Sequence, residues 1–202
     1  HLRAAEGAAP AERARLLALA RVLDGRQLAL KVSANSYYGG CGAGDRGKLP
    51  NMAVSAVVTL TGREAMDIKK RILPEHFPGV QIVYGDTDSV MLTFANAEDV
   101  ATCAARAAEA SELVTSHFAQ LGFGNMVLEF EKVYHPYGLL EKKRYFGLKH
   151  EPRGDGTMEC KGIDCKGIET ERKDTLPFVK EVMRDCIDAL LTTKDVRAAL
   201  AV

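Results

Sequence analysis

The sequence lacks any run of about eighteen apolar residues, the length that a membrane-spanning helix needs. Its first twenty residues carry charges throughout and contain no apolar segment typical of a signal peptide. We therefore expect no membrane partner and no secretion signal. The five cysteines are odd in number, and only Cys160 and Cys165 lie close together, without a second pair at zinc-site spacing. Reduced thiols in an intracellular protein are the expectation.

The chain also lacks net charge, with 27 basic and 27 acidic residues, but the charges are unevenly distributed. Residues 1–50 contain eight Lys or Arg against four Asp or Glu, and residues 132–173 contain ten against seven. Residues 95–131 contain one against six. Positive charge is thus concentrated in two regions, so the zero total does not exclude a nucleic-acid partner.

Two aspartates lie one residue apart in a predicted β-hairpin. Apolar and β-branched residues at 80–84 and 89–94 predict its strands, and Gly85 with Asp86 supplies the predicted turn. Since side chains two apart in an extended chain point the same way, we expect Asp86 and Asp88 to face one site. Like charges that close repel unless a cation lies between them, and carboxylates on a short turn suit Mg²⁺. A solvated acidic turn is the alternative for this motif alone.

A polar stripe is predicted on the helix that begins at Arg26. At the helical period, Gln27, Lys31, Asn35 and Tyr38 span about 80° of the surface. This stripe suits contact with a triphosphate and a base pair, because Lys31 offers a compact positive charge, Asn35 a directed hydrogen bond and Tyr38 a flat surface. A solvated amphipathic helix is the competing interpretation.

A basic run follows at 142–145, where Lys142, Lys143 and Arg144 precede Tyr145. Cations interleaved with aromatic side chains are typical of nucleic-acid contacts, because phosphates attract charge and bases or sugars need flat apolar surfaces. A solvated basic edge strand is an equal alternative for this run by itself.

The remaining patterns predict helices and strands in blocks. Expected helices span residues 11–23, 26–38, 52–72 and 96–120. Asp24–Gly25 and Leu73–Pro74 are the expected breaks, and Asn96 is the expected cap of the fourth helix. A last helix is expected after Asp174 or Thr175, with Pro177 in its first turn. Expected strands span 127–134, 138–149 and 157–168. Separate blocks of this kind predict an α+β fold with an antiparallel sheet backed by helices.

The three polar segments together resemble the family B DNA polymerases. Tyr-Gly-Asp-Thr-Asp-Ser at 84–89 is similar to the carboxylate motif of that family, residues 31–39 to its fingers-helix motif, and residues 142–145 to its primer-duplex motif. They occur in the order and at about the spacing of the family. The resemblance covers roughly residues 20–195 and is strongest to delta and zeta catalytic subunits and viral relatives.

The resemblance implies a domain arrangement. It predicts a remnant of the fingers at residues 1–44, a palm at 45–170 with an antiparallel sheet, and the start of a helical thumb at 171–202. Because the chain begins without Met and ends within a helical pattern, we expect a piece of a longer polypeptide.

The resemblance also implies template-directed DNA synthesis, in which a primer 3′-hydroxyl attacks the α-phosphate of a dNTP with the help of two Mg²⁺ ions. Asp88 is implied to bind both ions, Asp86 to bind metal or tune the site, and Glu131 to act as a third ligand. Lys31, Asn35 and Tyr38 are implied to hold the nucleotide, and Lys142, Lys143, Arg144 and Tyr145 the primer duplex.

The implied partners are primer–template DNA and dNTPs. A sliding clamp and accessory subunits are expected for the full-length protein, in the nucleus or a viral replication compartment.

Departures from the family pattern leave alternatives open. The chain has no Asp-x-x-Ser-Leu-Tyr-Pro-Ser motif, which carries the other catalytic aspartate of the family, so we expect the isolated fragment to be inactive. Gly40 replaces an aromatic residue, and Lys173 an arginine. The rival hypothesis is a non-catalytic nucleic-acid-binding module with a palm-like shape, against which Asp86 and Asp88 argue. A reverse transcriptase-like enzyme is less consistent with Asp-Thr-Asp, because such enzymes carry adjacent aspartates.

Overall fold

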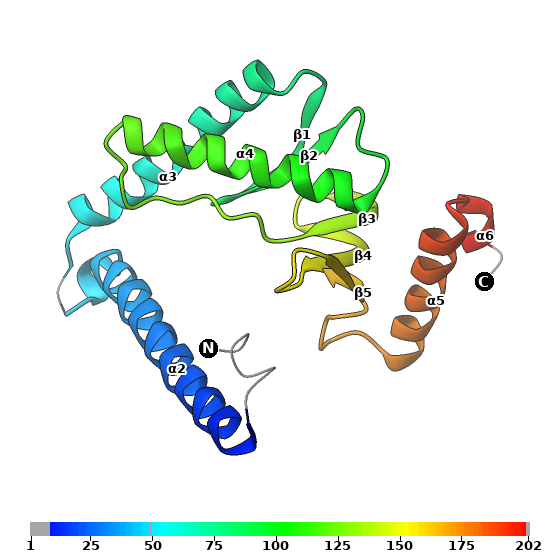
Figure 1. Ribbon diagram of the computed structural model, residues 1–202, viewed down its shortest axis with the longest axis horizontal. Helices are drawn as coiled ribbons and strands as arrows, with labels where there is room; N and C mark the ends of the chain where they lie inside the picture. Colours follow the sequence, from blue (N-terminus) through cyan, green and yellow to red (C-terminus); the bar gives the residue numbers. More distant parts are fainter. Residues whose placement is uncertain (1–8, 49, 201–202) are drawn as a thin grey trace. The chain divides into compact units, whose positions relative to one another are not determined.

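The computed structural model describes residues 9–48 and 50–200 (Figure 1). The chain divides into two compact units, residues 1–64 and 65–202, and the division falls within α3 (Met52–His76). Helices and antiparallel strands occur in separate blocks, which confirms the predicted α+β class. Over the described residues, no helix combines the length and apolar character needed to cross a membrane. The assignment of fingers, palm and thumb stays a prediction.

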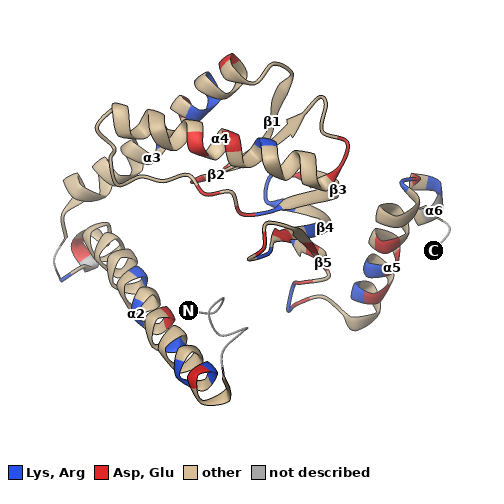
Figure 2. Cartoon of the chain, viewed as in Figure 1, with Lys and Arg blue, Asp and Glu red and all other residues tan. Residues whose placement is uncertain are grey.

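The first unit is built around one long helix, α2 (Pro10–Cys41), followed by the short 3₁₀ turn η1 (Gly44–Arg46). The predicted break at Asp24–Gly25 is wrong, because α2 runs through both residues without interruption. A glycine inside a helix costs only about 1 kcal/mol relative to Ala, and the Ala- and Leu-rich sequence before it outweighs that cost. Basic positions are spread along α2 (Figure 2).

The second unit contains a two-stranded antiparallel sheet, β1 (Val80–Asp86) and β2 (Ser89–Phe94). The predicted strands are confirmed, but the predicted turn at Gly85–Asp86 is wrong. Asp86 still belongs to β1 and pairs with Ser89, so the turn consists of Thr87 and Asp88. Strand pairing through Asp86 therefore outweighs the preference of Gly85 for a turn.

The helices on either side of this sheet differ from the prediction at their ends. Helix α3 continues past Leu73–Pro74 to His76, because a proline in the last turn removes few helical hydrogen bonds. Helix α4 (Val100–Gln120) begins after Asp99, not at Asn96. The Asp99 carboxylate caps it by accepting hydrogen bonds from the backbone N of Thr102 at 2.9 Å and from its hydroxyl at 2.6 Å.

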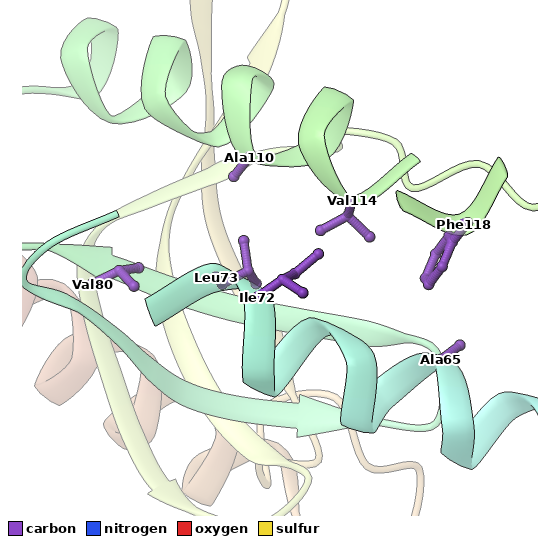
Figure 3. Packing of buried hydrophobic residues seen from close by; sticks show 7 residues of the cluster. All are labelled: Ala65, Ile72, Leu73, Val80, Ala110, Val114 and Phe118. Atoms are coloured by element: carbon purple, nitrogen blue, oxygen red, sulfur yellow. The ribbon is translucent and has the colours of Figure 1, made fainter. Parts of the chain in front are cut away.

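The main hydrophobic core lies between α3, α4 and the β1–β2 hairpin. Ile72 and Leu73 from α3 face Val114 and Phe118 from α4, and Val80 joins them from β1 (Figure 3). The partly buried side chains of Leu92 and Phe94 extend this cluster along β2. Both helices thus fix the hairpin from the side that carries its apolar residues.

A three-stranded antiparallel sheet follows, with β3 (Val133–Glu141), β4 (Arg144–Pro152) and β5 (Met158–Lys166) in that order. The strand predicted at 127–134 is wrong over residues 127–132, which pair with no other strand among the described residues, whereas residues 133–134 begin β3. The predicted strand at 138–149 is two strands joined by a turn at Lys142–Lys143. The strand predicted at 157–168 is confirmed as β5.

The chain ends with α5 (Pro177–Thr193) and α6 (Val196–Leu200). Pro177 occupies the first turn of α5 as predicted, but the cap residue is Leu176, and Asp174 instead pairs with Arg172 at 2.8 Å. A second apolar cluster joins Phe146 of β4 to α5. Its buried members are Phe146, Ile168, Ile187 and Leu191.

We expect Ile72→Ala to lower the free energy of unfolding by about 2–5 kcal/mol, because it removes a side chain that is 1% exposed at the centre of the core. Leu60 lies on the same helix but is 53% exposed, so Leu60→Ala should change the free energy of unfolding by about 0.5 kcal/mol or less. Urea denaturation of both variants measures the difference. Equal losses would contradict the position of the core.

Candidate functional site

The tips of two hairpins meet within the second unit. The turn of the β3–β4 hairpin is Lys142–Lys143, and the backbone N of Lys143 donates a hydrogen bond of 3.0 Å to the hydroxyl of Tyr84 on β1. The Lys143 ammonium lies 3.6 Å from the carboxylate of Asp86. The basic turn predicted for DNA and the acidic turn predicted for metal are therefore tied to each other.

The two aspartates differ in their surroundings. Asp86, at the end of β1, is partly buried and pairs with Lys143. Asp88 is exposed, and its carboxylate makes no salt bridge among the residues that the structure describes. The hydrogen bond to Asp88 comes from Lys69, whose ammonium donates to the backbone oxygen at 2.7 Å. The Asp88 carboxylate thus remains available to a ligand.

Lys69 is a residue that the sequence did not predict for this site. Its side chain is 3% exposed. Burial lowers the pKa of its ammonium, and the negative charge of Asp88 opposes that change. The one signal in the sequence was a lysine within the otherwise apolar face of α3, at the period of Ala65, Ile72 and Leu73.

The turn itself is strained. Thr87 has a φ of 55°, although it is β-branched. A positive φ at the first of two turn residues is the pattern of a type II′ turn, where glycine is usual. The hydroxyl of Ser89 supports the turn by donating to the backbone oxygen of Asp86 at 3.1 Å. Such backbone strain is typical of functional turns.

A cleft of about 480 Å³ opens beside the hairpin. It is lined by all of β2, by the unpaired residues 127–132 and by the facing side of α4. Asp88 and Glu131 both contribute to its wall. Among the described residues, no three acidic, histidine or cysteine side chains come close enough to form a metal cluster. The assignment of Asp86, Asp88 and Glu131 to metal stays a prediction.

The long edges of the cleft carry backbone groups without ladder partners. Strand β2 pairs only with β1, so its other edge is unpaired in the described part of the chain. Opposite it, residues 126–132 run without a strand partner, and Leu128 is bonded on both its N and its O to the hydroxyl of Thr115.

Four tyrosines pack around the hairpin tips. The ring centroids of Tyr134 and Tyr137 are 5.6 Å apart, and Tyr145 lies 5.9 Å from Tyr84 and 5.7 Å from Tyr137. Burial raises the pKa of Tyr137 to about 12. Tyr145 is thus partly buried within this group of tyrosines, a position that the sequence did not predict.

The cations of the basic run have different partners. Arg144 donates two hydrogen bonds, of 2.6 and 2.9 Å, to the carboxylate of Glu169 and one of 3.0 Å to Glu141. The Lys142 side chain is exposed and the Lys143 side chain is 65% exposed. The Lys142 side chain is thus open to solvent, and the Lys143 side chain is mostly exposed although its ammonium pairs with Asp86. The Arg144 guanidinium holds the second hairpin to the segment after β5. Their assignment to DNA stays a prediction.

The predicted nucleotide residues lie in the first unit. Lys31, Asn35 and Tyr38 are all exposed, and α2 is regular through these positions, so they occupy one stripe of its surface. Their assignment to the nucleotide stays a prediction.

Comparison with known proteins gives a consistent result. Residues 12–202 match the family model for DNA polymerase family B. The DNA polymerase delta catalytic subunit of Drosophila melanogaster is 43% identical over 188 residues, which is 90% of this chain and 16% of that protein. The subunits of Bos taurus and Candida albicans are each 42% identical, over 90% and 88% of this chain. The chain spans only 16% to 17% of the length of these relatives.

The position of the Lys142–Lys143 turn depends on Gly167. Its φ is +66°, and a Cβ there would collide with the backbone oxygen of Lys143. We expect Gly167→Ala to lower the free energy of unfolding by about 1 kcal/mol more than Gly156→Ala, measured by thermal unfolding. Gly156 has a φ of +88° but open space around it, so the pair separates the collision from the backbone strain. Equal losses would show that this contact is unimportant.

Proposed function

Because this chain belongs to DNA polymerase family B, we propose that it is part of the catalytic region of a DNA-directed DNA polymerase, a nucleotidyltransferase of DNA replication. The observation that carries the proposal is the exposed carboxylate of Asp88. It lies on the two-residue turn of the β1–β2 hairpin, which borders the cleft and contacts the basic Lys142–Lys143 turn through Asp86. A nucleic-acid-binding module without catalysis would explain Lys142 and Lys143. It would not explain Asp88, whose charge repels phosphates when no cation is bound.

Asp88 is our first choice for a metal ligand. Lys69 binds its backbone oxygen and leaves the carboxylate free, and hard carboxylate oxygens suit a small divalent cation. Bound divalent ions, Mg²⁺ in this proposal, supply activation of the attacking 3′-oxygen and neutralise charge on the leaving pyrophosphate. Asp86 forms an ion pair with Lys143, which favours a role in tuning the electrostatics of the site over direct metal binding. Glu131, which lines the cleft, is the third candidate for a metal ligand.

We propose that the second catalytic aspartate comes from a further strand of the complete polypeptide, which enters the cleft. In the described part of the chain, β2 has no partner on its second edge, and residues 126–132 have no strand partner, although the N and O of Leu128 are bonded to the hydroxyl of Thr115. A strand inserted beside β2 would pair with that edge and place a side chain near Asp88.

The cations then divide into two roles. Lys142 and Lys143 hold the phosphate backbone of the primer duplex, and Arg144 supports their hairpin through Glu169. Lys31 and Asn35 hold the triphosphate, and Tyr38 packs near the nascent base pair. A sliding clamp, accessory subunits and a location in the nucleus or a viral replication compartment belong to the same proposal for the complete polypeptide.

Asp88→Asn in the complete polypeptide should reduce primer extension by several orders of magnitude and leave the affinity for primer–template DNA unchanged, because it removes a metal ligand and no DNA contact. Asp155→Asn, on the exposed turn between β4 and β5, is the control and should extend primers normally. Single-turnover extension and DNA titration measure the two quantities. Normal turnover by Asp88→Asn would refute the assignment.

The 202-residue chain alone should not extend a primer, because it lacks the second aspartate motif, but it should bind duplex DNA weakly and with strong salt dependence. Replacing Lys142 and Lys143 together by Ala should make the negative slope of log K against log salt shallower by about 1.8, since each lost phosphate contact removes about 0.9 from its magnitude. Lys70→Ala, an exposed cation of α3, should leave the slope unchanged. An unchanged slope in the double variant would exclude these lysines from the DNA interface.

A further inference from the structure

Lys69 is an unusual residue for the interior of this unit. Lysine is rarely buried unless its charge is paired. Lys69 is 3% exposed, yet it forms no salt bridge among the described residues, whereas the next residue, Lys70, pairs with Asp67 at 3.6 Å on the surface. The one hydrogen bond of the Lys69 ammonium within the described structure goes to the backbone oxygen of Asp88. The packing of α3 alone does not require a charge here.

The bond from Lys69 acts where the hairpin is least supported. The ladder ends at the pair Asp86 and Ser89, and the two turn residues beyond it are exposed. Thr87 holds a positive φ that a β-branched residue rarely adopts, so the turn needs a contact from outside the hairpin to keep it. Among the described residues, Lys69 supplies the hydrogen bond that links this turn to the helix beneath it.

The geometry of that bond determines the direction of a carboxylate. The carbonyl that accepts it is bonded to the Cα of Asp88, so fixing the carbonyl fixes the peptide plane after Asp88 and restricts the Cα–Cβ direction. Asp88 is one of the residues that line the cleft, so the direction of its Cα–Cβ bond decides how its carboxylate meets a ligand there. An apolar side chain of similar size in place of Lys69 would fill the same space without a donor to orient the carbonyl.

We propose that Lys69 is a positioning residue, which holds the backbone of Asp88 from inside the protein and thereby orients the carboxylate that binds the catalytic metal. This inference rests on the proposed polymerase function. It adds a residue of α3, outside the three sequence motifs, to the machinery of the site.

The test compares Lys69→Met with Lys70→Met in the complete polypeptide. Methionine keeps a long unbranched side chain and removes the charge and the donor, and replacement of a buried charge by an apolar residue is often tolerated. Hydrogen exchange of amides 86–89 should become at least tenfold faster in Lys69→Met. The Mg²⁺ concentration for half-maximal extension should rise at least fivefold and kcat should fall at least tenfold, while the KM for dNTP stays within twofold. Lys70→Met should match the wild type in every measurement.

Two further variants make the result decisive. Lys69→Arg keeps the charge and the donor and should restore exchange and Mg²⁺ requirement to within threefold of the wild type. Lys69→Leu, which also removes the charge and the donor, repeats the comparison if Lys69→Met does not fold. Wild-type exchange and Mg²⁺ requirement in a folded Lys69→Met or Lys69→Leu protein would overturn the inference. If the wild-type polypeptide does not extend primers, the proposed function fails, and hydrogen exchange still reports on the Lys69 contact.

Discussion

The candidate site depends on one constraint, the closure of the β1–β2 hairpin in two residues. Because Asp86 still pairs with Ser89, only Thr87 and Asp88 remain to reverse the chain. Thr87 adopts a φ of 55°, at a cost of about 1–3 kcal/mol for such a residue. The surrounding structure offsets this cost through the ladder on one side and the hydrogen bond from Lys69 on the other. The result is two carboxylates at one tip: Asp86 pairs with Lys143, and Asp88 has no salt-bridge partner in the described part of the chain.

A chain of contacts extends this constraint to the second hairpin. The absence of a side chain at Gly167 leaves room for the backbone oxygen of Lys143. The amide of the same residue then reaches Tyr84, and its ammonium reaches Asp86. The acidic and basic tips are therefore positioned together. Beneath them, the packing of Ile72 against α4 gives the first hairpin a fixed base.

The sequence predicted the elements better than their ends and partners. Runs of β-branched and apolar residues located β1 and β2 correctly. A similar run at 127–134 predicted a strand of which residues 127–132 have no strand partner in the described part of the chain, since residue types show strand preference but not whether a neighbouring edge exists. The turn at Lys142–Lys143 was missed because neither residue is typical of a turn, and Lys143 adopts a φ of 66° that its sequence does not signal.

The sequence by itself determined the residue types and spacings of the site: the aspartates at 86 and 88, the basic run at 142–145, and through them the membership in DNA polymerase family B. Only the tertiary structure decided the partners of these residues. Lys69 meets Asp88 across 19 residues, Arg144 meets Glu169 across 25, and Lys143 meets Tyr84 across 59. Periodicity and composition describe the chain locally, whereas these contacts arise from how distant segments pack, which no local pattern encodes.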